Sequence, residues 1–506
     1  MLKRNLIANY LGQGWTALMN LAFIPLYIKY IGIEAYGLIG LFAVVQAALN
    51  LLDMGMTPTL GREMARFSGG AHTAQSIRDL LRSIELITWS IALVIALGIW
   101  AISGWLASDW LRTEKLSTEV IAQAFTIMGL VAAIRFVETI YHSSISGLQQ
   151  QVLLNAMNAG LATLRGLGAV AILVWVSPTL WAFFLWQGLV SILTIGILVI
   201  NTYRLIPRGE YSGQFSWDAL QQVWRFSSGM LGITVLSLLL TQVDKILLSK
   251  LLPLSEYGYY TISCSVAATI FMFIGPIAQA WYPRFCALHA SNDEMQLAEN
   301  YHKATQLVTV IGGSAAVVVI FFSRELLLLW TQNTVLAEKA SALVSVLMLG
   351  NIFNGFMTIP YQMQLAHGWT SLTMKINMGT VLIIVPVILL VTPIWGALGA
   401  AWVWVGINVF YILIAVNFMY RRILKKQRWR WYTQDLLLPM SSSIIASGLV
   451  KFFQPSELNR GGQSGLIVFA SIVTIMSAAM ASKYMRSIIV QLSSDMLEFF
   501  GFKKRL

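Results

Sequence analysis

Stretches of about twenty apolar residues follow one another along almost the whole chain, with short polar segments between them. An α-helix of about 20 residues crosses the roughly 30 Å hydrocarbon core of a bilayer. Charged residues make up only 11% of the sequence, whereas a soluble domain carries about 25%. A chain of this length with so little charge must present most of its surface to lipid. The sequence therefore predicts an all-α polytopic membrane protein.

The apolar stretches predict about fourteen transmembrane helices. The spans are expected near residues 6–28, 37–60, 84–107, 120–143, 152–177, 180–203, 226–249, 257–283, 304–323, 340–365, 374–392, 397–420, 435–453 and 465–484.

The formal charge of +12 is distributed unevenly across these spans. If the N-terminus is cytoplasmic, 23 of the 34 Lys and Arg fall in cytoplasmic segments, 8 in outer segments, and Arg135, Arg165 and Lys245 within spans. The positive-inside rule then predicts that both termini are cytoplasmic. The basic excess is thus a topology signal, and nucleic acid is not an expected partner. The basic run 421–430, which contains Trp429, favours anchoring to anionic membrane lipids over a specific partner site.

The sequence contains signs of an internal duplication. Residues 29–37 recur as 250–258, 158–160 match 377–379, and 176–178 match 391–393, at offsets of about 220 residues. Six predicted helices separate the copies, so both halves have the same orientation. Parallel repeats of this kind typically enclose a substrate site.

The repeat predicts four parts of the chain. These are an N-terminal six-helix bundle (1–203), a cytoplasmic linker (204–222), a C-terminal six-helix bundle (223–422), and two extra transmembrane helices with a cytoplasmic tail (423–506).

Several predicted spans carry polar side chains at steps of three and four residues, which places each set on one helix face. A polar face cannot look into lipid. It either lines a hydrated cavity or joins helices by hydrogen bonds, and for several stripes together we favour the cavity. The amide candidates for substrate binding are Asn9, Gln13, Asn50, Asn158 and Asn354.

Charges inside spans cost about 2.5–3.5 kcal/mol each on insertion scales, so each one needs a reason. Arg165 has no carboxylate on its own helix and is the strongest candidate for holding a negative charge, because a guanidinium grips phosphate through paired hydrogen bonds. Arg135 has Glu138 one turn away, so an ion pair within the helix is the simpler interpretation. Asp53 could carry an ion or pair with either arginine.

The remaining charged and titratable candidates fall into two groups. The other cations expected to bind an anionic headgroup, or to attract it as it approaches the site, are Lys245, Arg62 and Arg284. Asp53, Glu138, Asp244 and His142 are the candidates for ion coupling. Arg62 and Arg284 lie at corresponding inner helix ends, where the positive-inside rule alone also predicts arginines.

Motifs for bond-making chemistry are missing from the sequence. It contains no G-x-x-x-x-G-K-[ST] phosphate loop, no H-E-x-x-H, no cysteine pair for a metal and no G-x-S-x-G turn. We therefore expect a transporter without a cofactor or metal.

Segments from both halves of the chain form a recognisable set. They are Asn9-Tyr10-Leu11 through Pro25-Leu26-Tyr27, residues 32–38, Asp53-Met54-Gly55, 61–66, Asp244-Lys245, 255–260 and Pro283-Arg284-Phe285. Through these segments the chain resembles the O-antigen and polysaccharide flippases of the multidrug, oligosaccharidyl-lipid and polysaccharide exporter superfamily, and the resemblance spans essentially its whole length.

The resemblance implies a V-shaped pair of six-helix bundles in a bacterial inner membrane that opens alternately inward and outward. The implied substrate is an undecaprenyl-diphosphate-linked oligosaccharide, with coupling to a proton or sodium gradient and polysaccharide-assembly proteins as partners.

Three alternatives remain open. The expected number of fourteen helices is similar to that of lipid II flippases. The arginine cluster typical of their first helix is replaced here by Asn9, Gln13 and Asn20. A cation-coupled multidrug exporter could use Asp53. A membrane polymerase or ligase of the same glycolipids usually has a large outer loop, and the predicted outer segments 108–119, 324–339 and 454–464 are short.

Overall fold

The computed structural model describes residues 2–499, apart from 50, 54, 69–71, 115, 210, 368, 370, 426 and 456–458. The side chains of residues 2–10, 13, 219, 222–234, 237, 283, 287, 290, 371 and 492–499 also lie outside the description. The chain divides by contacts into two compact units, Met1–Thr261 and Ile262–Leu506.

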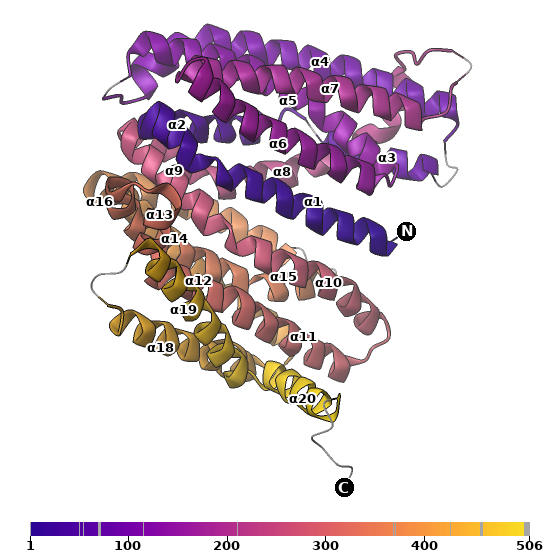
Figure 1. Ribbon diagram of the computed structural model, residues 1–506. Helices are drawn as coiled ribbons and strands as arrows, with labels where there is room; N and C mark the ends of the chain where they lie inside the picture. Colours follow the sequence, from indigo (N-terminus) through magenta and orange to yellow (C-terminus); the bar gives the residue numbers. More distant parts are fainter. Residues whose placement is uncertain are drawn as a thin grey trace. The chain divides into compact units, whose positions relative to one another are not determined.

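The first unit is built from long helices that run side by side (Figure 1). They are α1 (Leu2–Ala22), α2 (Ile24–Leu49), α3 (Met56–Ser68), α4 (Ala74–Trp105), α5 (Thr118–Gly147), α6 (Gln151–Trp175), α7 (Leu180–Leu205), α8 (Trp217–Leu251) and the first half of α9 (Leu254–Ala268), with a π-helical turn at Leu106–Trp110. α5 packs against α4 and α7, and α6 packs against α1. Exposed Leu93, Trp100 and Leu189 lie on the outer faces of α4 and α7, as expected for side chains in contact with lipid.

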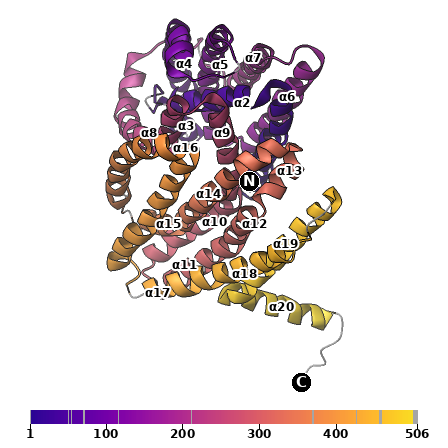
Figure 2. The same cartoon turned by 90° about the vertical axis from the view of Figure 1, so that its left-hand side faces the viewer.

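The second unit contains the rest of α9 and the remaining helices. They are α10 (Ile270–Ala290), α11 (Glu294–Val308), α12 (Ser314–Phe321), α13 (Ser323–Thr331), α14 (Thr334–Phe356), α15 (Thr358–Ala366), α16 (Ser371–Arg422), α17 (Arg428–Arg430), α18 (Leu438–Phe452), α19 (Arg460–Ala481) and α20 (Lys483–Phe499), with π-helical turns at Thr309–Gly313 and Trp431–Leu437. α18 and α19 pack against each other and against α12 (Figure 2).

The predicted fold class is confirmed. Among the described residues, eleven helices are long and apolar enough to cross a membrane. The count of fourteen and the parallel-repeat arrangement remain predictions.

Three predicted spans have a different local form. The span expected at 37–60 is interrupted, because α2 ends at Leu49 and α3 begins at Met56, with Gly55 at a φ of 75° between them. The spans expected at 374–392 and 397–420 are joined as α16, whose 52 residues would extend about 78 Å if straight. Gly396, at a φ of 58°, bends α16 between the two expected spans, at a backbone conformation that side chains with a Cβ rarely adopt.

The expected linker, residues 204–222, lies against the start of α4. Arg78 Nε donates to the Pro207 carbonyl at 2.8 Å, and the backbone N–H of Gln214 donates to Asp79 Oδ1 at 2.8 Å. These contacts hold the described part of the linker within the first unit.

The two copies of the repeated segment contact each other in the first unit. A Cβ on Gly258 would lie 2.4 Å from the Ile33 carbonyl oxygen, and one on Gly37 would lie 2.8 Å from that of Leu254. The backbone N–H of Glu114 donates to Glu34 Oε1 at 2.9 Å beside this contact. Glycine at both positions therefore lets the two segments approach backbone to backbone.

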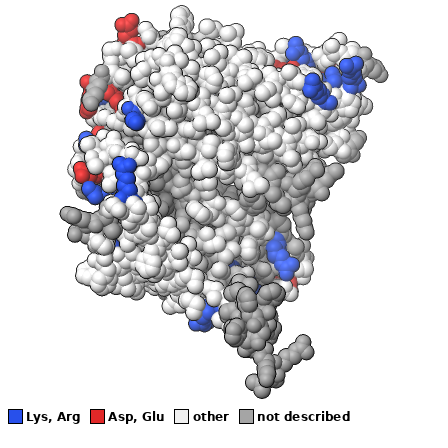
Figure 3. Space-filling model, in the orientation of Figure 1, with Lys and Arg blue, Asp and Glu red and all other residues white. Residues whose placement is uncertain are grey.

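On the face shown in Figure 3, charged side chains of the first unit lie toward the two ends of its helices. On that face, the surface between these ends is uncharged. Such a band is what a helix bundle in a bilayer presents to the hydrocarbon.

Candidate functional site

Three packed helices of the first unit bring polar side chains together. α5 carries Arg135 and Glu138, and α6 carries Arg165. α7 contributes three further polar residues at steps of four and three, which lie on one face of that helix. They are Gln187, Ser191 and Thr194, all buried.

Arg165 forms an ion pair with Glu138 across the α5–α6 contact. Its Nη2 donates to the two carboxylate oxygens at 2.9 and 3.1 Å. The same nitrogen lies 3.2 Å from Ser191 Oγ and 3.3 Å from Thr194 Oγ1. The side chain of Arg165 is 24% exposed and that of Glu138 is 8% exposed. The pair is therefore largely buried, but the Arg165 side chain remains partly exposed.

The ion pair leaves part of the Arg165 guanidinium unused. Its Nε is buried without a hydrogen-bond partner in the described protein. Every hydrogen bond that Arg165 makes from its side chain to a described residue comes from Nη2. A guanidinium has five N–H donors in a planar fork. Arg165 therefore keeps donors for a ligand while one nitrogen is held by the protein.

The hydrogen bonds of Arg135 to described residues all go to neutral groups. Its Nη1 donates to Gln46 Oε1 at 3.1 Å, its Nη2 donates to Gln187 Oε1 at 2.7 Å, and its Nε lies 3.4 Å from Ser191 Oγ. The guanidinium also stacks over the Phe42 ring at 5.2 Å. This hydrogen-bonded cluster, as far as the structure describes it, contains two guanidiniums linked through Ser191 and one carboxylate bonded to Arg165, so it has an excess of one positive charge.

The predicted ion pair between Arg135 and Glu138 within one helix is wrong. A spacing of three residues puts both on the same side of α5, but Glu138 pairs with Arg165 from the neighbouring helix. Asp53 is not the partner of either arginine, because its hydrogen bonds go to Thr57.

Asp53 caps the first turn of α3. Its carboxylate oxygens accept from the Thr57 backbone N–H at 3.0 and 3.1 Å and from the Thr57 hydroxyl at 2.5 Å. A carboxylate at this position satisfies unpaired N–H groups and interacts favourably with the helix dipole. The Thr57 hydroxyl lies 3.3 Å from Thr139 Oγ1, which connects the cap to α5.

Lys245 and Asp244 do not join the arginine cluster. Lys245 Nζ donates to the Thr241 carbonyl of its own helix at 2.8 Å, and Asp244 accepts from the Tyr260 hydroxyl at 2.7 Å. Arg62 is exposed on α3, 3.9 Å from Glu63.

The other predicted residues are scattered. Arg284 is exposed on α10 of the second unit, where its Nη2 lies 3.4 Å from Gln296 Oε1. Asn158 on α6 and His142 on α5 are half-buried in the first unit. Asn354 donates to Asn408 at 2.9 Å in the second unit. Asn50 lies outside the described residues, as do the side chains of Asn9 and Gln13.

Sequence reasoning missed a buried polar network in the second unit. His302 Nδ1 contacts Asp435 Oδ2, and its Nε2 lies 3.1 Å from Gln427 Oε1. Gln306 donates to Asp435 Oδ1 at 2.8 Å and accepts from the Ser482 hydroxyl at 2.7 Å. This network joins α11 to the π-helical turn Trp431–Leu437 and to the end of α19. The polar positions 302, 305, 306 and 309, at helical spacing, were the available signal.

The described part of the chain contains no group of three His, Cys, Asp or Glu side chains that could hold a metal ion. The arrangement instead offers hydrogen-bond donors and a buried positive charge at membrane depth, which is suited to binding an anionic group.

Comparisons with known proteins agree with this fold. The sequence matches the profile of the polysaccharide biosynthesis protein family over residues 2–289, and that of the MatE family over 230–390. It is 20% identical over 429 residues to a protein of Shigella flexneri named "Putative O-antigen transporter", covering 83% of this chain and 98% of that one.

Several solved structures share the fold. The lipid II flippase MurJ in an inward closed conformation has a TM-score of 0.72 at 13% identity, covering 96% of this chain and 99% of the other. A multidrug resistance MATE family transporter of the MOP superfamily, in an inward-facing conformation, has a TM-score of 0.62 at 14% identity, covering 80% and 96%.

These matches define a multi-pass membrane transporter of the multidrug, oligosaccharidyl-lipid and polysaccharide exporter superfamily. The chain belongs to the polysaccharide biosynthesis protein family, whose profile covers more than half of it. The resemblance inferred from the sequence is thereby confirmed.

Proposed function

We propose that this transporter moves an undecaprenyl-diphosphate-linked oligosaccharide from the cytoplasmic to the outer leaflet of the bacterial inner membrane, for O-antigen or other surface polysaccharide synthesis. Both termini are cytoplasmic in this proposal, and the cycle proceeds by alternating access. The observation that carries it is the arginine cluster, in which Arg165 and Arg135 both contact Ser191, and in which Glu138, bonded to Arg165, is the one carboxylate among their described hydrogen-bonded partners.

The chemistry of the cluster favours a diphosphate. A guanidinium presents paired N–H groups that match two phosphate oxygens. The uncommitted donors of Arg165 and the excess positive charge would be stabilised by an anion, since an uncompensated charge at this depth is costly. The name of the Shigella flexneri relative supports the same class of substrate.

The experiment separates a binding role for the charge from a structural role for the ion pair. Arg165→Ala removes the guanidinium but leaves Glu138 unpaired. The double variant Glu138→Gln and Arg165→Gln removes both charges together and retains groups that can hydrogen-bond. We expect both variants to lose surface polysaccharide while the chain stays in the membrane at normal abundance. Normal polysaccharide in the double variant would contradict the proposal.

A control variant is Arg62→Gln, at an exposed position in the middle of α3. It removes one positive charge outside the cluster, so we expect a smaller decrease in surface polysaccharide than for Arg165→Ala. Membrane abundance of all three variants is measured by immunoblot of washed membranes.

Coupling to a proton or sodium gradient and cation-coupled drug export are separate proposals that involve Asp53. The match to the MatE family over residues 230–390 favours keeping drug export as a second candidate. Asp53→Asn is expected to end drug resistance if that candidate is right. Unchanged drug sensitivity after deletion of the gene would contradict it.

A further inference from the structure

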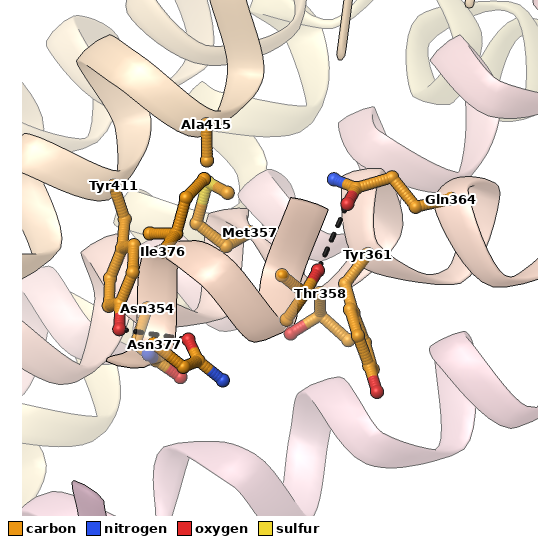
Figure 4. A pocket seen from close by; sticks show the side chains of 10 residues that line it. Asn354, Met357, Thr358, Tyr361, Gln364, Ile376, Asn377, Tyr411 and Ala415 are labelled. Atoms are coloured by element: carbon orange, nitrogen blue, oxygen red, sulfur yellow. Dashed lines mark hydrogen bonds between the residues drawn. The ribbon is translucent and has the colours of Figure 1, made fainter. Parts of the chain in front are cut away.

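The second unit contains a pocket that the arginine cluster does not include. It is a cavity of about 270 Å³ between α14, α15 and α16, and its described lining combines amide and hydroxyl groups with apolar surface (Figure 4). The polar residues that face it include Asn354, Thr358, Tyr361, Gln364, Asn377 and Tyr411.

Hydrogen bonds within the protein use only part of this polar lining. The Tyr411 hydroxyl donates to Asn377 Oδ1 at 3.0 Å, and Thr373 donates to Gln364 Oε1 at 3.0 Å (Figure 4). Asn354 uses its Nδ2 to donate to Asn408 at 2.9 Å. The amide nitrogens of Asn377 and Gln364 therefore remain as donors, and Asn354 Oδ1 remains as an acceptor.

Two hydroxyls complete the set. Thr358 and Tyr361 line the pocket, and neither side chain forms a hydrogen bond with a described residue. A hydroxyl can both donate and accept. The pocket thus offers donors and acceptors in one place, next to the Tyr411 ring and the apolar side chains of Met357 and Ile376.

The described residues that line the pocket include no Lys, Arg, Asp, Glu or His. A phosphate or an organic cation entering this pocket would lose its hydration without meeting an opposite charge, which is costly. An uncharged polyol would exchange its hydrogen bonds with water for bonds to amides and hydroxyls. The cavity is slightly smaller than the roughly 300–1,000 Å³ that holds drug-sized ligands, which suits a single sugar ring.

We propose that this pocket binds an uncharged sugar residue of the transported glycan, with Asn377, Gln364, Thr358 and Tyr361 as its hydrogen-bonding groups. The inference rests on the proposed function for the identity of the glycan. It divides recognition by chemistry: the arginine cluster binds the diphosphate, and this pocket binds the sugar.

The experiment uses the full chain in lipid nanodiscs and two probes. One probe is the neutral oligosaccharide released by mild acid and phosphatase from the lipid carriers of the producing cell. The other is polyprenyl diphosphate without sugar. The double variant Thr358→Val and Tyr361→Phe removes two hydroxyls that have no partner in the described protein, so no bond within the described protein is lost. The matched control is Thr433→Val with Tyr211→Phe, at two exposed positions.

We expect the pocket variant to bind the neutral oligosaccharide about tenfold more weakly than the wild type, because two uncharged hydrogen bonds are lost. Its affinity for polyprenyl diphosphate should not change. Arg165→Ala should show the opposite pattern, and the control should match the wild type with both probes.

Equal binding of the oligosaccharide by the pocket variant and the wild type would overturn the inference, as would an equal loss of both probes. If the wild type binds the oligosaccharide but not polyprenyl diphosphate, the sugar pocket stands and the proposed diphosphate site fails.

Discussion

Two buried ionic clusters, one in each unit, differ in how completely the protein satisfies them. The Arg165–Glu138 pair in the first unit leaves the arginine 24% exposed. The His302–Asp435 pair in the second unit is 1% and 0% exposed, and both oxygens of Asp435 and both ring nitrogens of His302 have partners.

This difference separates a binding site from a structural joint. A fully satisfied polar network holds its helices in one arrangement and offers nothing to a ligand. A cluster with uncommitted donors and an excess positive charge is stabilised when it binds an anion. We therefore interpret the His302–Asp435 network as the connection that fixes the π-helical turn Trp431–Leu437 and the end of α19 to α11, and the arginine cluster as the candidate binding site.

The largest effect is expected from Asp435→Ala. It leaves the donors of His302 and Gln306 without their buried partner, so we expect the free energy of unfolding to fall by about 3–5 kcal/mol. Denaturant unfolding of the purified protein in detergent measures this, with Asp435→Asn as a conservative control that keeps an acceptor. A loss below about 1 kcal/mol would show that the network does not hold the second unit together.

A smaller loss of stability is expected from Glu138→Gln. Arg165 keeps Ser191 and Thr194 as partners and is partly open to solvent, so the free energy of unfolding should fall by roughly 1–3 kcal/mol. Binding of polyprenyl diphosphate in nanodiscs should persist or tighten, because the competing carboxylate has become neutral. A loss as large as that of Asp435→Ala, together with abolished binding, would remove the distinction between the two clusters.

The smallest effect is expected from Lys451→Met, which breaks a pair with Glu325 at 2.5 Å near the other end of α18. The Lys451 side chain is 34% exposed and that of Glu325 is 10% exposed. Because solvent screens the interaction, the free energy of unfolding should fall by at most about 1 kcal/mol. Unfolding at low and high salt measures it, and Arg324→Met in the more exposed pair with Glu338 is the control. A loss comparable to that of Asp435→Ala would show that exposure does not rank these ion pairs.

Helical spacing predicted which residues share a face, but not which helices face each other. Arg165 stood out in the sequence as a charge in an apolar span without a carboxylate on its own helix. Its partner Glu138 was assigned to Arg135 instead, because a pattern along one helix contains no information on the rotation of its neighbour. Gln187, Ser191 and Thr194 lay in the sequence as a polar stripe on an apolar span and gained a meaning only from their contacts with both arginines.

His302 and Asp435 were overlooked for a related reason. Both lie at the edges of predicted spans, where charged residues usually contact water or headgroups. Only the packing of α11 against the π-helical turn at Trp431–Leu437 removes them from solvent. Asp53 shows the reverse case: a carboxylate inside a predicted span proved to be the cap of a helix that begins there.

The sequence by itself determined that this chain is an all-helical membrane protein, because apolar length and the scarcity of charge leave a helix in lipid as the only way to satisfy the backbone. Tertiary structure alone decided which buried charges are paired, which donors remain uncommitted and where an uncharged pocket opens. Those properties depend on distances of about 3 Å between side chains far apart in the chain, and helix periodicity does not specify such distances.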